Sequence, residues 1–277
     1  MELINAEYEK LLYIKYSKPY VYNLSSKNKR LYYFGVDHAN NPNDILFYYL
    51  DKSFELFQPQ LVLVEGLPQI NLNEDNDFWN IIKSANSSNL ISKYGENLYA
   101  AQLAKKNGSN VFSPEPKLYD EALFIFQNNL SKEYIFLYYM CRFIFQWYRV
   151  KEGYDFLEYM NQGITYLEKE LRWNDFDFSF KNLNSIHKNI FKTNIITNEC
   201  SFYKNIVDPV FRKKNNKYFN LKIFNVSRLS SIYRDKRMLE QIEIFIRLFD
   251  KIFIVYGSSH AYVQKRFLID LFSSLDI

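Results

Sequence analysis

Four short apolar segments constrain the fold of this chain more than any other feature of its sequence. They cover residues 31–35 (LYYFG), 61–65 (LVLVE), 110–112 (NVF) and 252–256 (IFIVY). Turn-forming residues bound these segments, and their apolar character is continuous rather than alternating. Continuous apolar strands are typical of a parallel or mixed sheet that is covered on both faces. We therefore expect four strands in one such sheet.

The segments between these strands show helical periodicity. Asn43 is expected to cap a helix that continues to about residue 57, because apolar residues recur there on one face. A second helix is expected at 96–106, where Gly108 closes it. Alternation of strand and helix predicts βαβ units with right-handed crossovers.

The pattern changes between residues 117 and 226. This region contains aromatic helical segments, followed by an Asn-rich part for which the sequence predicts no definite structure. The sheet pattern then resumes. Further helices are expected at 132–150, 154–172, 230–249 and 262–272. The predicted fold class is α/β, a single domain over 1–277 with a mostly parallel central sheet flanked by helices and a helical insertion at 117–226.

Charge and hydropathy argue against nucleic acid and membrane partners. The formal charge is +4 and the isoelectric point is near 8.7, with basic residues dispersed along the chain. The one dense basic run, 212–217, is typical of a solvated loop. The most apolar segment, 134–148, contains Arg142 and is shorter than the roughly 20 apolar residues that a membrane span needs. We expect no nucleic-acid partner and no membrane span.

The two cysteines, Cys141 and Cys200, indicate a reducing compartment. They lack metal-ligand spacing, so neither a disulfide framework nor a thiolate zinc site is expected. The N-terminus shows neither the basic nor the apolar region of a secretory signal. These features predict a cytoplasmic protein.

Two of the three histidines lie in the same local pattern, an apolar strand followed by Gly-x-x-His. The two sequences are 33–38 (YFGVDH) and 255–260 (VYGSSH). With seven glycines in the chain, such a match by chance has a probability on the order of a few in a thousand. Glycine lets the chain leave the strand without a Cβ clash, and His38 and His260 are then expected at the carboxyl edge of the sheet, where ligands bind.

Two imidazoles in one pocket can act as general base and acid near neutral pH, or they can coordinate a divalent metal. A single histidine in a loop more often binds a backbone group. For the matched pair, His38 and His260, we favour a shared site over two unrelated structural histidines.

Charged residues near the strand ends extend this candidate site. Glu65 ends an apolar strand, where an unpaired carboxylate is costly, so it is expected to orient a histidine, bind metal or take a proton, unless it is a helix cap or loop charge. Arg234 begins the helix before the last strand and is a candidate for stabilising negative charge. The candidate substrate-binding residues are Asp37, Glu96, Glu115 and Arg237, of which the arginine also fits an ordinary solvated helix face.

Several of these motifs together resemble a known family. The motifs are Gly35-x-x-His38, Val64-Glu65-Gly66, Gly95-Glu96, Arg234-Asp235-x-x-Met238 and Gly257-x-x-His260. In order and spacing they are similar to the TraB/PrgY and Tiki family, whose superfamily includes erythromycin esterases and ChaN-like haem-binding proteins. The match covers roughly the first 115 and the last 50 residues, and 117–226 carries no matching motif. TraB-like chains usually have Asp-Arg after the third strand, where this chain has Pro114-Glu115-Pro116.

The resemblance implies an EreA/ChaN-like, Tiki-like fold in which His38, Glu65, Arg234 and His260 line one pocket. Tiki proteins are metal-dependent proteases, erythromycin esterases hydrolyse a lactone without an evident metal, and ChaN-like proteins bind haem. A divalent transition metal (Mn, Co or Zn) held by His38, Glu65 and His260 is therefore one expectation, and catalysis without a metal is another.

The leading hypothesis is a hydrolase of a peptide, ester or other small-molecule substrate. In it His38 or His260 activates water, Glu65 orients that histidine or helps to bind a metal, and Arg234 stabilises developing negative charge. The alternatives are a ChaN-like haem-binding module, and a toxin or effector domain that uses the helical insertion to contact another protein.

Overall fold

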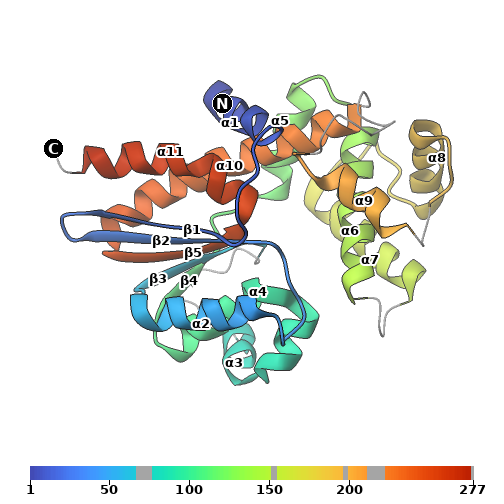
Figure 1. Cartoon of the computed structure of the whole chain (residues 1–277). Coiled ribbons are helices and arrows are strands. Elements are labelled where there is room, and N and C mark those ends of the chain that lie inside the picture. Colours follow the sequence, from blue (N-terminus) through green and yellow to red (C-terminus); the bar gives the residue numbers. More distant parts are fainter. Residues whose placement is uncertain (67–76, 151–154, 196–198, 211–221, 276–277) are drawn as a thin grey trace. The chain divides into compact units, whose positions relative to one another are not determined.

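The computed structural model describes residues 1–66, 77–150, 155–195, 199–210 and 222–275. The chain divides into two compact units (Figure 1). The buried residues of each unit form their own clusters. The α/β unit contains Glu2–Glu7, Tyr13–Glu115 and Asp235–Ile277, and the helical unit contains Met1, Tyr8–Leu12 and Pro116–Arg234.

The α/β unit is built on a five-stranded mixed sheet. Its strands are β1 (Tyr20–Ser26), β2 (Lys29–Val36), β3 (Leu61–Val64), β4 (Asn110–Phe112) and β5 (Lys251–Gly257), in the order β1-β2-β5-β3-β4. The β1–β2 pair is antiparallel, and the other three pairs are parallel. The four predicted strands are present. The sequence analysis missed β1, because polar residues interrupt its apolar pattern (YVYNLSS).

Helices cover both faces of this sheet, as the continuous apolar strands predicted (Figure 1). Phe34 and Val36 of β2 pack on one side, against α2 (Ile45–Phe57), α3 (Asp77–Ser84) and α4 (Ser87–Lys106). Leu31 and Tyr33 of the same strand pack on the other side. Their neighbours there lie on α11 (Ser258–Ser274) and on α10 (Lys222–Leu248) from Asp235 onward.

Several helix boundaries differ from the sequence prediction. α4 begins at Ser87 rather than at residue 96, with a kink at Gly95. The N-cap of α2 is Asp44 rather than Asn43, because the Asp44 side chain accepts the backbone N–H of Leu46 at 2.9 Å. α10 begins before residue 230. α11 begins directly after β5 rather than at residue 262, so His260 lies in the first helical turn and not in a loop.

The helical unit contains the remaining helices of the described residues. These are α5 (Leu118–Gln127), α6 (Lys132–Val150), α7 (Phe156–Leu171), α8 (Phe180–Phe191), α9 (Cys200–Val207), the first half of α10 and the end of α1 (Glu2–Leu11). Its core is rich in aromatic residues, with Phe136 and Tyr203 fully buried. The predicted insertion covered 117–226, close to the main segment of this unit, and the basic run 212–217 lies outside the described residues. Within the part of the chain that is described, no helix is long and apolar enough to cross a membrane.

The glycines of the two Gly-x-x-His motifs have different structural roles. Gly35 lies within β2, where an added Cβ would stand 2.6 Å from Ala261 Cβ and 2.7 Å from the carbonyl oxygen of Tyr20. Its missing side chain therefore lets α11 and β1 approach β2. At Gly257 the nearest atom to an added Cβ is 3.5 Å away, and the backbone angle φ of −52° suits any residue.

The pair Gly35→Ala and Gly257→Ala tests this difference. We expect Gly35→Ala to lower the free energy of unfolding by about 1–3 kcal/mol, because helix or strand must move away from the added methyl group. Gly257→Ala should change it by less than about 0.5 kcal/mol, as is usual away from such features. Urea unfolding followed by circular dichroism measures both. Equal losses of stability in the two variants would contradict the different roles assigned to the glycines.

Candidate functional site

Three adjacent strand ends bring the candidate residues together. β5 lies between β2 and β3, with Val36 opposite Gly257 and Val64 opposite Val255 in the parallel register. His38, Glu65 and His260 follow these strands at the same edge of the sheet. This is the edge at which open parallel sheets bind ligands.

The side chains of these three residues converge above Gly257. A Cβ atom built on Gly257 would lie 3.5 Å from Glu65 Oε2, 3.6 Å from His38 Nε2 and 3.6 Å from His260 Cδ2. One point is therefore within van der Waals reach of an acid and of both imidazole rings. The absence of a side chain at Gly257 leaves that point open.

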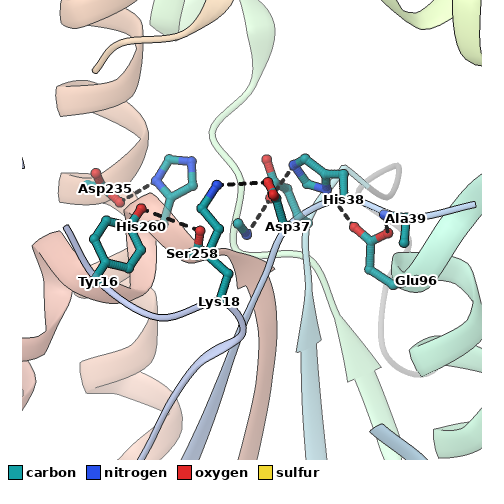
Figure 2. Close-up of polar contacts among 11 residues, drawn as sticks. Tyr16, Lys18, Asp37, His38, Ala39, Glu96, Asp235, Ser258 and His260 are labelled. Atoms are coloured by element: carbon teal, nitrogen blue, oxygen red, sulfur yellow. Dashed lines mark hydrogen bonds and ion pairs between the residues drawn. The ribbon is translucent and has the colours of Figure 1, made fainter. Parts of the chain in front are cut away.

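His38 is fixed by a buried carboxylate from α4. Its Nδ1 lies 2.5 Å from Glu96 Oε1, and the backbone N–H of Ala39 donates to Glu96 Oε2 at 3.0 Å (Figure 2). Gly95, with a φ of +75°, kinks α4, so Glu96 starts a new helical segment at which a negative charge is favoured. The predicted substrate-binding residue Glu96 thus holds His38.

The ion pair with His38 determines the protonation of Glu96. Burial by itself would raise the pKa of this carboxyl, but the charge and hydrogen bond of His38, with the Ala39 N–H, outweigh burial and lower the pKa below its usual value. Glu96 is therefore ionised at neutral pH. It accepts a hydrogen bond from Nδ1 of His38. The other ring nitrogen, Nε2, then faces the point above Gly257.

His260 has an equivalent partner on α10. Its Nδ1 lies 2.7 Å from Asp235 Oδ1, and both side chains are buried (Figure 2). Gln264, one turn further along α11, donates to the same oxygen of Asp235 at 2.5 Å. Each motif histidine is therefore held through Nδ1 by a buried carboxylate, the arrangement that fixes a catalytic or ligating imidazole.

Glu65 lies beside Gly257 and the ring of His38. Its Oε2 accepts the backbone N–H of Gly257 at 3.0 Å and stands 3.9 Å from His38 Nε2. The second distance is too long for a direct hydrogen bond. It is short enough for one water molecule to hydrogen-bond to both atoms at about 2.8 Å.

The segment before β1 contributes two contacts at the same edge. Lys18 donates to Asp37 at 2.9 Å, and the hydroxyl oxygens of Tyr16 and Ser258 are 3.4 Å apart (Figure 2). The Asp37 side chain is 70% exposed, beside His38. Lys18 and Tyr16 were not identified from the sequence, because no pattern connects this segment to the strand ends.

Arg234, Arg237 and Glu115 are not the side chains nearest to Gly257. Arg234 is buried and belongs to the helical unit, of which it is the last residue. Arg237 pairs with Glu240 at 2.6 Å on the helix surface, about 200° round α10 from Asp235. Glu115 is partly exposed and follows β4, the edge strand of the sheet, which is separated from β5 by β3.

The third histidine, His187, is a structural residue of the helical unit. It is fully buried on α8, where Nδ1 donates to the carbonyl of Thr193 at 2.9 Å and the Tyr203 hydroxyl lies 3.3 Å from Nε2. Burial lowers its pKa, so it is held neutral. Both ring nitrogens are used in hydrogen bonds within the unit.

Asp235 and Gln264 are two further site residues that were not identified from the sequence. A helical signal was present for both. Asp235 shares a face with Met238 and Ile242 at positions i, i+3 and i+7 of α10, and Gln264 shares one with His260 at i+4 of α11. A polar residue on an otherwise buried helix face needs a hydrogen-bond partner. This requirement could have identified both residues.

No group of three His, Cys, Asp or Glu side chains arranged to hold a metal ion is found among the described residues. No protein-family model matches the chain, no curated protein matches it, and no solved structure matches it.

Replacement of Glu96 by glutamine tests the His38 pair. Glu96→Gln keeps the size of the side chain and removes its charge, so we expect a loss of about 1 kcal/mol in unfolding free energy at neutral pH. The pKa of Glu96 is lower in the folded protein than in the unfolded chain. The ionised carboxylate therefore stabilises the fold above the ordinary glutamate pKa, about 4.3, and this stabilisation is lost as the pH falls through the pKa of the folded protein. Urea unfolding of both proteins from pH 7 to pH 3 should therefore show a gap that closes at low pH.

Asp37→Asn is the matched control, since this exposed carboxylate belongs to a surface ion pair. Its effect at pH 7 should be close to zero. A Glu96→Gln gap that stays constant down to pH 3 would show that the carboxylate does not stabilise the fold through its charge.

Proposed function

We propose that this protein is a hydrolase that cleaves an ester or peptide bond, with His38 as its base and His260 as its acid. One observation carries the proposal: both imidazoles, each held through Nδ1 by a buried carboxylate, converge with Glu65 on the point above Gly257. Two histidines in fixed orientation at one point provide a proton acceptor and a proton donor near neutral pH.

His38 is assigned as the base. Its side chain is 41% exposed, so water reaches it more readily than it reaches the buried His260. A water molecule between His38 Nε2 and Glu65 Oε2 gives one proton to the ring and is oriented by the carboxylate through the other. Glu96 stabilises the imidazolium that forms.

His260 is assigned as the acid. Asp235 accepts a hydrogen bond from its Nδ1, which leaves Nε2 to carry the proton that the ring gives up. From Nε2 the ring donates a proton to the leaving oxygen or nitrogen when the bond breaks. The two steps together add one water molecule across the bond. The rings return to their starting states when His38 gives a proton to solvent and His260 takes one up.

Negative charge on the reacting carbonyl oxygen needs a stabilising group at the same edge. α11 begins at Ser258, beside the site, and the N-terminus of a helix carries positive partial charge. We assign oxyanion stabilisation to this helix end. Lys18, at 2.9 Å from Asp37, adds a positive charge at the same edge of the sheet. The role predicted for Arg234 is supported by the sequence alone.

The resemblance to the TraB/PrgY and Tiki family and to erythromycin esterases supports the same reaction class. It favours an EreA/ChaN-like form of the fold and leaves peptide and ester or lactone substrates as alternatives. The steps above use the chain's own side chains, and a divalent metal held by His38, Glu65 and His260 remains the alternative way to activate water. A cytoplasmic location belongs to the proposal, on the basis of the two cysteines.

A substrate panel tests the proposal. Purified protein is assayed against p-nitrophenyl esters, lactones and fluorogenic peptides, each with and without a chelator. Chelator-resistant hydrolysis supports catalysis without a metal, whereas activity lost on chelation and restored by Mn, Co or Zn supports the metal-dependent alternative. A Soret band on addition of haem that His38→Ala abolishes, without hydrolysis of any substrate, would support the haem-binding alternative instead.

His38→Ala should lower kcat/KM on the best substrate of this panel by about 10²–10⁴-fold, because it removes the base. Stability should fall as well, because the buried Glu96 carboxylate loses the ring nitrogen that compensates it, so kinetics are compared under conditions in which the variant is folded. Arg247→Ala, on the exposed surface of α10, is the control and should retain full activity. Undiminished hydrolysis by a folded His38→Ala protein would refute the assignment.

Gly257→Ala should fold normally and still lose about 10²-fold in kcat/KM, since its methyl group occupies the point at which the reacting atoms meet. Steady-state kinetics on the same substrate measures this loss. Wild-type kinetics in Gly257→Ala would place the reaction elsewhere.

A further inference from the structure

Two fully buried polar side chains, Gln264 and Tyr33, continue the hydrogen-bond chain behind His260. Tyr33 lies on β2 and Gln264 on α11, and neither is exposed to solvent. The Tyr33 hydroxyl donates to Gln264 Oε1 at 3.0 Å. Gln264 Nε2 then donates to Asp235 Oδ1 at 2.5 Å, and Asp235 Oδ1 lies 2.7 Å from His260 Nδ1.

The Tyr33 hydroxyl and the Asp235 carboxylate together fix which way the amide of Gln264 points. Burial above all, and then the neighbouring Tyr22 and Asp235, raise the pKa of Tyr33 well above its ordinary value, so the hydroxyl keeps its proton and remains a donor. The Asp235 carboxylate can only accept, so it takes the amide nitrogen, and the hydroxyl donates to the amide oxygen at the other end. The amide nitrogen is thereby directed to Asp235 and to the sulfur of Met238, 3.6 Å away.

The direction of the amide determines the state of Asp235 and His260. Asp235 Oδ1 faces an N–H of Gln264, so this oxygen is the acceptor in that contact. The second contact of the same oxygen, with His260 Nδ1, then requires an N–H on the ring. The neutral ring consequently has its lone pair on Nε2, so this is the nitrogen that must take up the proton that His260 donates in the proposed reaction.

We propose that Gln264 and Tyr33 are positioning residues, which fix the Asp235 carboxylate and through it the Nδ1–H tautomer of His260. Their catalytic importance rests on the proposed function, but their effect on the tautomer does not. His38 differs, because its carboxylate is held by the backbone N–H of Ala39 and by the start of a helical segment. The state of His38 is therefore independent of this chain of side chains.

The test uses imidazole nitrogen NMR, which resolves the protein's three histidines in the full chain without a substrate. In the wild-type protein we expect His260 to show a protonated Nδ1 whose proton exchanges slowly with water. Gln264→Met keeps the length of the side chain and removes the donor. We expect the His260 Nδ1–H signal to weaken or disappear and the nitrogen shifts to indicate a mixture of tautomers, with the signals of His38 unchanged.

Tyr33→Phe provides a second, milder variant, in which the amide of Gln264 is free to turn. We expect the same direction of change at His260 and a smaller extent. Tyr22→Phe is the matched control, since the Tyr22 ring stacks on Tyr33 at 5.2 Å while its buried hydroxyl has no hydrogen-bond partner among the described residues. It should leave all His260 signals as in the wild type.

Wild-type His260 signals in Tyr33→Phe and in folded Gln264→Met would overturn the proposal. If Gln264→Met fails to fold, Tyr33→Phe decides alone, by the presence or absence of the His260 change. A change of equal size in Tyr22→Phe would also overturn it, because packing rather than hydrogen bonding would then explain the effect. If the tautomer shifts and no substrate is ever hydrolysed, the positioning stands and the hydrolase proposal fails.

Discussion

The proposed site depends on the burial of two carboxylates beside two imidazoles. A carboxylate out of water is costly unless charge and hydrogen bonds compensate it, and Glu96 and Asp235 are both almost fully buried. Their compensation comes from the Nδ1 atoms of His38 and His260, with further N–H donors from Ala39 and Gln264. Each ring is therefore as rigid as the core behind it, and a rigid ring presents its second nitrogen in a constant direction.

The sheet topology gives these two pairs a common location. Because β5 is central, the residues that follow β2, β3 and β5 meet at one edge, although His38 and His260 are far apart in the chain. The two glycines complete the arrangement in different ways. Gly35 lets α11 pack closely on β2, whereas Gly257 leaves the space into which Glu65 and the two histidines point. The glycine of the first motif thus allows close packing, and the glycine of the second leaves space at the candidate site.

The sequence predicted those parts of the fold that have a strong local signal. Continuous apolar runs identified four strands, and the repeat of Gly-x-x-His identified both histidines as a pair. β1 was missed because an edge strand with alternating polar residues resembles a loop. The start of α11 was placed too late because Gly257 suggested a turn, whereas glycine here is the cap of a helix that follows the strand without a loop.

The partners of the histidines required the fold. Glu96 was identified, but as a residue for substrate, because no sequence pattern shows that α4 faces the end of β2. Asp235 stood beside Arg234 in the motif, and the arginine was chosen for its charge. On a helix adjacent residues point about 100° apart, so the two side chains lie on different faces of α10. Helical phase against the apolar residues Met238 and Ile242 distinguishes them, and it selects the aspartate.

The imidazole spectrum of Gly257→Ala tests the convergence of the two histidines most directly. Its one methyl group should contact both rings, so the signals of His38 and His260 should both shift, while those of His187 in the helical unit stay unchanged. A shift of His260 alone, the histidine that is near Gly257 in the sequence, would contradict a shared site.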